Sequence, residues 1–211
     1  ALGDAMRLAG IHDHLEVLLD CAERAAEGGF VDLLARATFA LLQLGASSDV
    51  GAVNARVARV PRRALDVLGE DEATAGIRAA ASLAWSMTGE PERARELFLS
   101  AERAASSPEV RRLVLPFAYL GLGLPGDVPR RAELAAELVA LAESAEDPVA
   151  LFEGLQLELS TCVALADGPG ARAALGRMHG LIDLVGDVGR RWQLLYLEAA
   201  LAHLDGELER S

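Results

Sequence analysis

The residue types best suited to metal binding come together near the start of the chain, at His12, Asp13 and His14. Histidine and carboxylate side chains are common metal ligands. On a helix, however, residues two apart point about 200° away from each other, so the two imidazoles cannot easily meet one ion. His179 and His203 have no ligand-type partner at a suitable spacing. We therefore predict no metal site and read the first group as solvated residues at a helix start.

Paired carboxylates for acid–base catalysis could come from residues 70–72 or 143–147. Both acidic groups lie at predicted helix ends, and for residues 70–72 and Asp147 the positive end of the helix dipole is reason enough for a negative charge. Ser160-Thr161-Cys162 has no nearby histidine that could activate a nucleophile. The sequence predicts no catalytic residue.

The chain has no lysine, because all 20 of its basic residues are arginine. This excludes a Schiff-base, P-loop or kinase-type lysine within the chain. Gly121 to Gly126 is glycine-rich like a phosphate loop, but no strand precedes it and no lysine follows. We expect a non-enzyme without a cofactor.

Aromatic and arginine side chains are the better candidates, because they are typical anchors of binding surfaces. They fall on the predicted first helices of helix pairs, which line the concave face of a superhelix. The alternative is that the aromatic residues are core and the arginines are solvated or paired with acids. The candidate ligand- or partner-binding residues are Trp85, Arg112, Tyr119, Phe152, Arg191, Trp192 and Tyr196.

The elements that must position these residues are helices. Hydrophobic residues make up 52% of the 211 residues, mostly Ala and Leu, with aromatics at only 4%. Ala and Leu are strong helix formers, and no stretch shows the alternation of a strand. We predict an all-α fold of about eleven helices in one domain, residues 1–211. A net charge of −12 argues against direct nucleic-acid contact.

Gly and Pro punctuation and apolar periodicity set the expected helix boundaries. Ser107-Pro108 and Asp147-Pro148 read as an N-cap followed by proline, a kink is expected at Pro116, and Pro61 is expected to open a helix. The predicted helices are 1–9, 12–26, 30–44, 50–59, 61–68, 71–88, 91–105, 108–120, 129–144, 148–166, 171–185 and 188–204.

The sequence also indicates the cellular location of the protein, the state of its cysteines and its relation to a longer chain. No run of 18 uncharged apolar residues and no signal peptide is visible, so we expect a cytoplasmic protein without membrane contact. Cys21 and Cys162 are expected to be free, buried thiols, with a disulfide as the lesser alternative. Because the chain opens without Met and closes one turn into a helix, we expect a piece of a longer repeat array.

Residues 85–101 carry a recognisable pattern: Trp85, a turn at Gly89, then Ala94, Phe98 and Ala101 on one helix face. These residues resemble the tetratricopeptide repeat. An earlier unit resembles it too, through Leu2-Gly3, Met6, Gly10, Leu15, Leu19 and Ala22. The units around Gly168 and Gly206 keep only the turn and small residues. The resemblance implies a right-handed superhelix of antiparallel helix pairs.

The whole chain, with phrases such as residues 1–10 and 198–206, also resembles the repeat region of large bacterial signal-transduction ATPases and LuxR-type transcriptional regulators, of an actinobacterial type. That resemblance implies a non-catalytic sensor or regulatory arm. Its groove would bind a peptide, a protein partner or a small effector. An all-α enzyme with a pocket between helices, and a scaffold that self-associates, are the alternatives.

Overall fold

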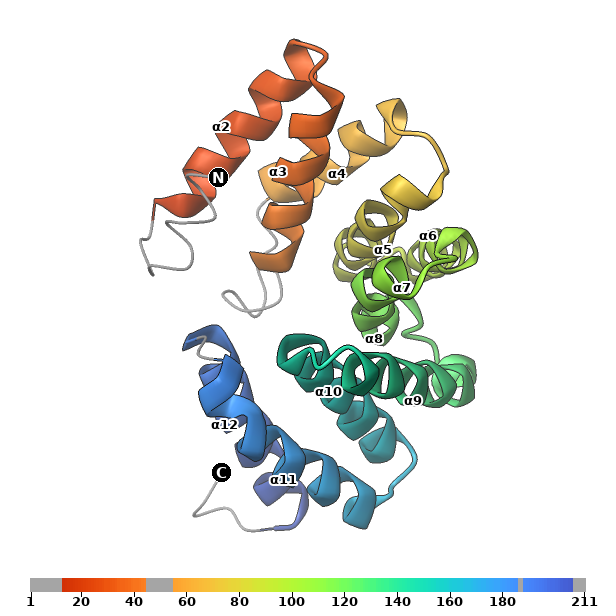
Figure 1. Ribbon diagram of the computed structural model, residues 1–211, viewed down its shortest axis with the longest axis vertical. Coiled ribbons are helices and arrows are strands. Elements are labelled where there is room, and N and C mark those ends of the chain that lie inside the picture. The colour runs from red at the N-terminus through yellow and green to blue at the C-terminus, as the bar shows by residue number, and fades with distance from the viewer. Residues whose placement is uncertain (1–12, 45–54, 186–187, 207–211) are drawn as a thin grey trace. The chain divides into compact units, whose positions relative to one another are not determined.

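The computed structural model describes residues 13–44, 55–185 and 188–206 (Figure 1). The described residues are almost entirely helical, and none of them lies in a strand. The all-α prediction is therefore confirmed. The expected helix 1–9, Gly10 and His12 lie outside the described residues, as does the interval between the predicted helices 30–44 and 50–59.

Contacts within the chain divide it into two compact units, an N-terminal unit of residues 1–123 and a C-terminal unit of residues 124–211. Helices that follow one another pack together in the N-terminal unit, most extensively α2 on α3 and α5 on α6. Its described elements are α2 (His14–Glu27), α3 (Val31–Leu44), α4 (Ala55–Val67), α5 (Glu72–Met87), α6 (Pro91–Ala104), α7 (Pro108–Val114), η1 (Leu115–Phe117) and α8 (Ala118–Gly121).

The C-terminal unit repeats this pattern of sequential pairing, with α10 packed on both α9 and α11 and α12 packed on α11. Its elements are η2 (Pro125–Asp127), α9 (Val128–Ser144), α10 (Pro148–Ala164), α11 (Gly168–Val185) and α12 (Val188–Leu204). Short loops between packed neighbours make these helix hairpins. A superhelical stack of such hairpins remains a prediction.

Each unit has its own hydrophobic core. In the N-terminal unit, Leu18, Leu19 and Ala22 of α2 pack with residues of α3 and α4, as the apolar stripe of α2 predicts. The face shared by Ala94, Phe98 and Ala101 on α6 is also confirmed, because all three are fully buried. In the C-terminal unit, α10, α11 and α12 share one core cluster that includes Phe152, Met178 and Leu194.

The predicted helix starts are confirmed at two caps. The Ser107 side chain accepts a hydrogen bond from the Val110 N–H at the start of α7, with Pro108 next to it. The Asp147 carboxylate accepts from the N–H groups of Val149 and Ala150 at the start of α10. Each cap satisfies N–H groups that the helix itself leaves without a partner. The kink expected at Pro116 is present as the 3₁₀ turn η1, which separates α7 from α8.

Pro61 is a correction, because it lies inside α4 rather than at the start of a new helix. Its ring removes one backbone hydrogen bond. The helix continues because Val60, Pro61 and Ala64 are buried on one side, and Val60 and Ala64 join the core formed with α2 and α3. Tertiary burial here outweighs the local signal of the proline.

The turns after α9 and α10 are made by residues that the sequence did not single out. Glu146 has φ 51° and Ala166 has φ 57°, the left-handed conformation that glycine usually supplies. Gly89 does adopt it, with φ 82°, at the turn after α5. The helix predicted over 171–185 begins earlier than expected, because α11 already starts at Gly168.

Candidate functional site

Trp85 lies in the core of the N-terminal unit. Its side chain is 2% exposed, and it packs with Ala81 and Ala94 of α5 and α6. The guanidinium groups of Arg62 and Arg93 lie over its ring, 5.2 and 5.3 Å from the centroid. Cation–π contacts of this kind stabilise a tryptophan that is otherwise buried. The structure thus gives Trp85 a packing role.

Phe152 is likewise internal. It is 0% exposed on α10 and belongs to the core of the C-terminal unit together with Leu155 and Met178. Neither Phe152 nor Trp85 is open to a ligand at the surface. The spacing of aromatic residues in the sequence could not separate these two from the exposed ones, because both kinds sit on amphipathic helices.

Trp192 and Tyr196 are exposed and stack on each other on α12. Their ring centroids are 5.6 Å apart and the ring planes are inclined by 13°. Trp192 is 47% exposed, Tyr196 57% and the neighbouring Leu195 63%. Three residues at i, i+3 and i+4 share one side of a helix. We call these three residues the α12 face.

Other residues of α12 hold it to the rest of the unit. Leu194 and Leu201 are buried in the shared core. Arg191 donates to Asp183 of α11 at 3.1 Å, and Arg190 donates to Glu153 of α10 at 2.7 Å. The α12 face therefore projects from an anchored helix. The sequence predicted Arg191 as a partner-binding residue, and the structure pairs it with Asp183.

Glu153, the ion-pair partner of Arg190, is partly buried. Burial raises the pKa of its carboxyl group, although the Arg190 guanidinium acts in the opposite direction. The raised pKa means that ionisation of this carboxyl is costly in the folded state.

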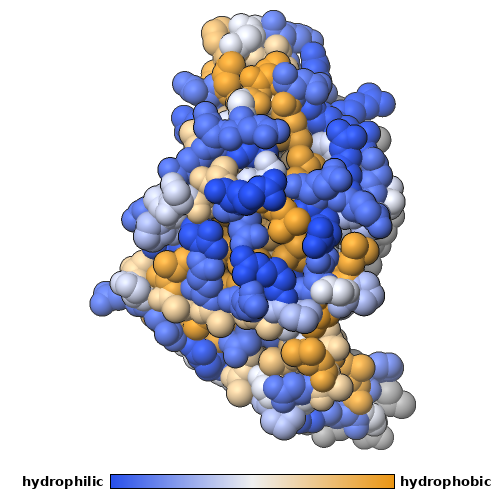
Figure 2. All heavy atoms as spheres, turned by 90° about the vertical axis from the view of Figure 1, so that its right-hand side faces the viewer, coloured by the Kyte–Doolittle hydropathy of each residue, from blue (hydrophilic) through white to orange (hydrophobic). Residues whose placement is uncertain are grey.

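The remaining predicted residues are in the N-terminal unit. Tyr119 on α8 is 46% exposed, and Arg112 on α7 is half-buried. They belong to a different compact unit from the α12 face. Exposed hydrophobic side chains also occur elsewhere, between hydrophilic ones, on the face drawn in Figure 2.

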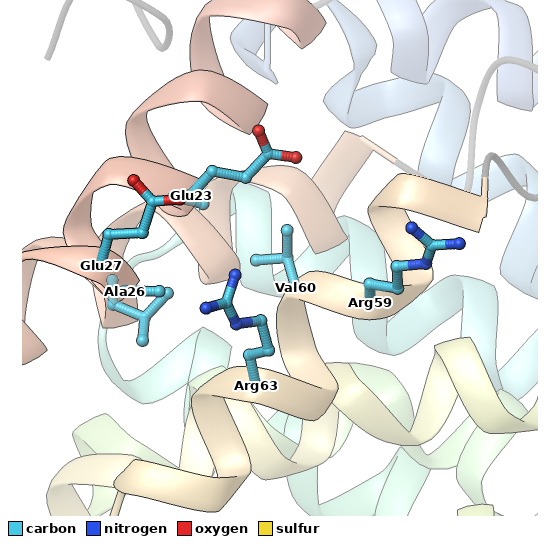
Figure 3. Close-up of a pocket in the computed structure, with 8 residues that line it drawn as sticks. Glu23, Ala26, Glu27, Arg59, Val60 and Arg63 are labelled. Carbon is cyan, nitrogen blue, oxygen red and sulfur yellow. The ribbon is translucent and has the colours of Figure 1, made fainter.

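A pocket between α2, α3 and α4 was not predicted from the sequence. Its volume is about 150 Å³, and it has an apolar floor and a charged rim. Figure 3 shows Glu23 and Glu27 projecting from α2, and Arg59 and Arg63 projecting from α4. We call it the α2–α4 pocket; its lining is Ala22, Glu23, Ala26, Glu27, Leu34, Arg59, Val60 and Arg63. The available signal was the i, i+4 spacing within each charged pair.

Ser160, Thr161 and Cys162, the nucleophile-type side chains considered from the sequence, show no sign of activation. The Ser160 and Thr161 hydroxyls both donate to the Leu157 carbonyl, at 2.8 and 2.7 Å. Burial, with the nearby Asp167 and Glu158, raises the pKa of the Cys162 thiol, which disfavours the reactive thiolate. Both cysteines are free, as predicted, but Cys21 is exposed on α2 rather than buried, and Cys162 is only partly buried.

In the described parts of the chain, no group of three or more His, Cys, Asp and Glu side chains is placed to hold a metal ion. None of the helices described combines the length and apolar character needed to cross a bilayer.

In comparisons with known proteins, no protein-family model, no curated protein and no solved structure matches this chain.

Proposed function

We propose that this chain is a non-catalytic helical module that binds a protein partner through the α12 face. The observation that carries the proposal is the exposed, stacked pair Trp192 and Tyr196 beside Leu195. Aromatic side chains dominate the energetics of protein interfaces because they bury a large area at low cost in conformational entropy. A monomer gains nothing from leaving such a cluster in water.

The partner is proposed to be an amphipathic helix with basic flanks. The α12 face is uncharged and apolar, so it matches the apolar stripe of another helix. In residues 124–211 acidic side chains outnumber basic ones, and the whole chain has a net charge of −12. Lysine or arginine beside the stripe would therefore be attracted to the surface around α12.

Within a larger protein, we propose that this docking makes the module a sensor or regulatory arm of a signalling ATPase or transcriptional regulator. Support for this wider role comes from the resemblance of the sequence and from the paired helices of the fold. Docking that favours one arrangement of the parent protein would shift its equilibrium by the difference in affinity between states.

A designed helical peptide tests the docking step. One peptide carries a leucine stripe flanked by lysines, a second has the same composition in scrambled order, and a third has glutamate in place of lysine. Trp192 fluorescence reports binding. We expect the first peptide to bind and the scrambled one not to, and Tyr196→Ala to weaken binding by about 30-fold, the loss of a hot-spot residue.

Tyr119→Ala, which removes an exposed aromatic residue of the N-terminal unit, is the matched control and should leave binding unchanged. Equal binding of the striped and scrambled peptides, or no loss with Tyr196→Ala, would contradict the proposal. Light scattering over a dilution series addresses the alternative of self-association. Association that Tyr196→Ala abolishes would assign the α12 face to a second copy instead.

A further inference from the structure

α12 is apolar on more than one side, so hydrophobic burial alone does not decide which side faces the core. Leu194 and Leu201 are buried in the core cluster shared with α10 and α11. The α12 face, formed by Trp192, Leu195 and Tyr196, carries larger side chains and is left exposed. Because the hydrophobic effect is non-directional and follows buried area, turning α12 about its axis would still bury a large apolar surface. A directional interaction must therefore hold the observed orientation.

A partly buried ion pair supplies such an interaction. Arg190 of α12 donates to Glu153 of α10 at 2.7 Å, and the two side chains are only 23% and 31% exposed. Water screens exposed ion pairs, whereas partly buried pairs are screened less. Charged contacts of α11 with α12, or with Asp205 just after it, are more exposed than this pair; they are Arg191–Asp183, Arg172–Asp205 and His179–Glu198.

The Arg190–Glu153 pair is directional because it fits one orientation of α12. Arg190 lies one turn before Leu194, so both side chains are on the same side of the helix. If α12 turned to bury the α12 face, Arg190 would move away from Glu153 and leave that carboxylate without this partner. A partly buried charge that loses its partner is strongly unfavourable, even where the intact pair adds little to stability.

We propose that the Arg190–Glu153 ion pair selects which side of α12 is buried and so keeps the α12 face turned to solvent. Arg190 and Glu153 are positioning residues, because they act through the placement of Trp192 and Tyr196. The value of this orientation for docking rests on the proposed function. The orientation itself does not, since it is a property of the chain without any partner.

Fluorine NMR of the chain labelled with fluorotryptophan measures the orientation with no peptide present. The chain has two tryptophans, Trp85 and Trp192, and Trp192→Phe assigns their signals. A soluble gadolinium chelate relaxes the signal of an exposed ring faster than that of a buried one. In the unmodified chain we expect fast relaxation for Trp192 and slow relaxation for the core residue Trp85.

Reversing the charges tests the pair. Arg190→Glu places two carboxylates together, so α12 should turn and the relaxation of Trp192 should fall toward that of Trp85. Arg190→Glu combined with Glu153→Arg restores an ion pair and should restore fast relaxation. Arg190→Ala combined with Glu153→Ala leaves neither charge and should also slow the relaxation, which decides the question if the singly reversed chain does not fold.

Arg177→Gln is the matched control. It removes an arginine of the same unit from an exposed ion pair with Glu143 of α9, away from α12, and should leave the Trp192 signal unchanged. If the Arg190–Glu153 pair only stabilised the fold, the folded variants would keep the relaxation of the unmodified chain. If it only held α12 in place, Trp192 would relax faster. Either result, or no recovery in the doubly reversed chain, would overturn the proposal.

The striped peptide then connects orientation with docking. Arg190→Glu should weaken its binding at least about tenfold, as expected when a hot-spot pair is withdrawn. The added acid would attract the lysine flanks of the peptide, so charge alone predicts the opposite change. If the unmodified chain does not bind the peptide, the proposed function fails, and the relaxation of Trp192 still decides whether the ion pair sets the orientation of α12.

Discussion

The guanidinium group of Arg62 lies 5.2 Å from the centre of the Trp85 ring, so α4 is joined to α5 by a cation–π contact. The same arginine donates to the Glu90 carboxylate at 2.8 Å, just before α6 begins. Trp85 is thereby a point where three consecutive helices of the N-terminal unit meet. Because its ring is nearly inaccessible, its contribution is to the stability of that unit.

Replacing Trp85 with alanine is expected to lower the free energy of unfolding by about 3–5 kcal/mol, since it leaves a large cavity among close-packed residues. Trp192→Ala provides the control. It removes the same side chain from a site that is 47% exposed, and the expected loss is within about 1 kcal/mol. Urea unfolding followed by circular dichroism measures both. Similar losses in the two variants would show that Trp85 is not a core residue.

Glycine at position 121 permits a close approach between α8 and α6. A Cβ atom there would lie 2.5 Å from the Phe98 Cβ atom. Gly121→Ala should therefore destabilise the protein by about 1–3 kcal/mol, as overpacking does. At Gly176, within α11, nothing lies within 4 Å of the added atom. Gly176→Ala should stabilise by about 0.5–1 kcal/mol through helix propensity. Thermal or urea unfolding distinguishes the two signs.

Glu146 and Ala166 hold a left-handed conformation that costs a residue with a Cβ atom about 1–2 kcal/mol. Glycine relieves this cost but gains freedom in the unfolded chain, so Glu146→Gly and Ala166→Gly should each stabilise by about 0.5–1 kcal/mol. Ala145→Gly is the control, because Ala145 has φ −93° and should only lose stability. A loss in all three variants would refute this account of the turns.

Glu72 caps the segment between α6 and α7. Its carboxylate accepts hydrogen bonds from the Ser107 N–H at 2.6 Å and from the N–H and hydroxyl of Ser106 at 3.0 and 2.8 Å. These bonds, the Ser107 N–H first, lower the pKa of Glu72 from 4.5 to about 2. Because its pKa is lower in the folded chain, its stabilising contribution is complete above pH 4.5 and is lost as the pH falls toward about 2.

Glu72→Gln should therefore reduce stability near neutral pH and have progressively less effect as the pH falls below 4.5. Urea unfolding at several pH values measures this difference. Glu92→Gln, which changes an exposed glutamate on α6, is the control. If the Glu72 variant differs from the parent chain equally at all pH values, the hydrogen bonds to Ser106 and Ser107 do not carry the effect.

The helices and most of their ends could be predicted from the sequence because their signals are local. Ser107-Pro108 and Asp147-Pro148 start helices through side-chain caps that need no distant contact. Apolar spacing identified the buried face of α6 for the same reason. Where a local signal met a tertiary one, as at Pro61, the burial of neighbouring side chains decided the outcome.

The candidate sites could not be predicted in this way, because they depend on contacts between helices and not on local signals. Trp85 and Trp192 occupy similar amphipathic patterns, yet one is 2% exposed and the other 47%, because exposure depends on which helices pack on each side. Glu27 and Arg63 both line the α2–α4 pocket, although they lie far apart in the sequence. By itself the sequence determined an acidic, all-helical chain and the faces that its helices bury, since these depend on composition and spacing. Only the tertiary structure decided which aromatic residues remain exposed and which opposite charges share a pocket, because both result from contacts between helices.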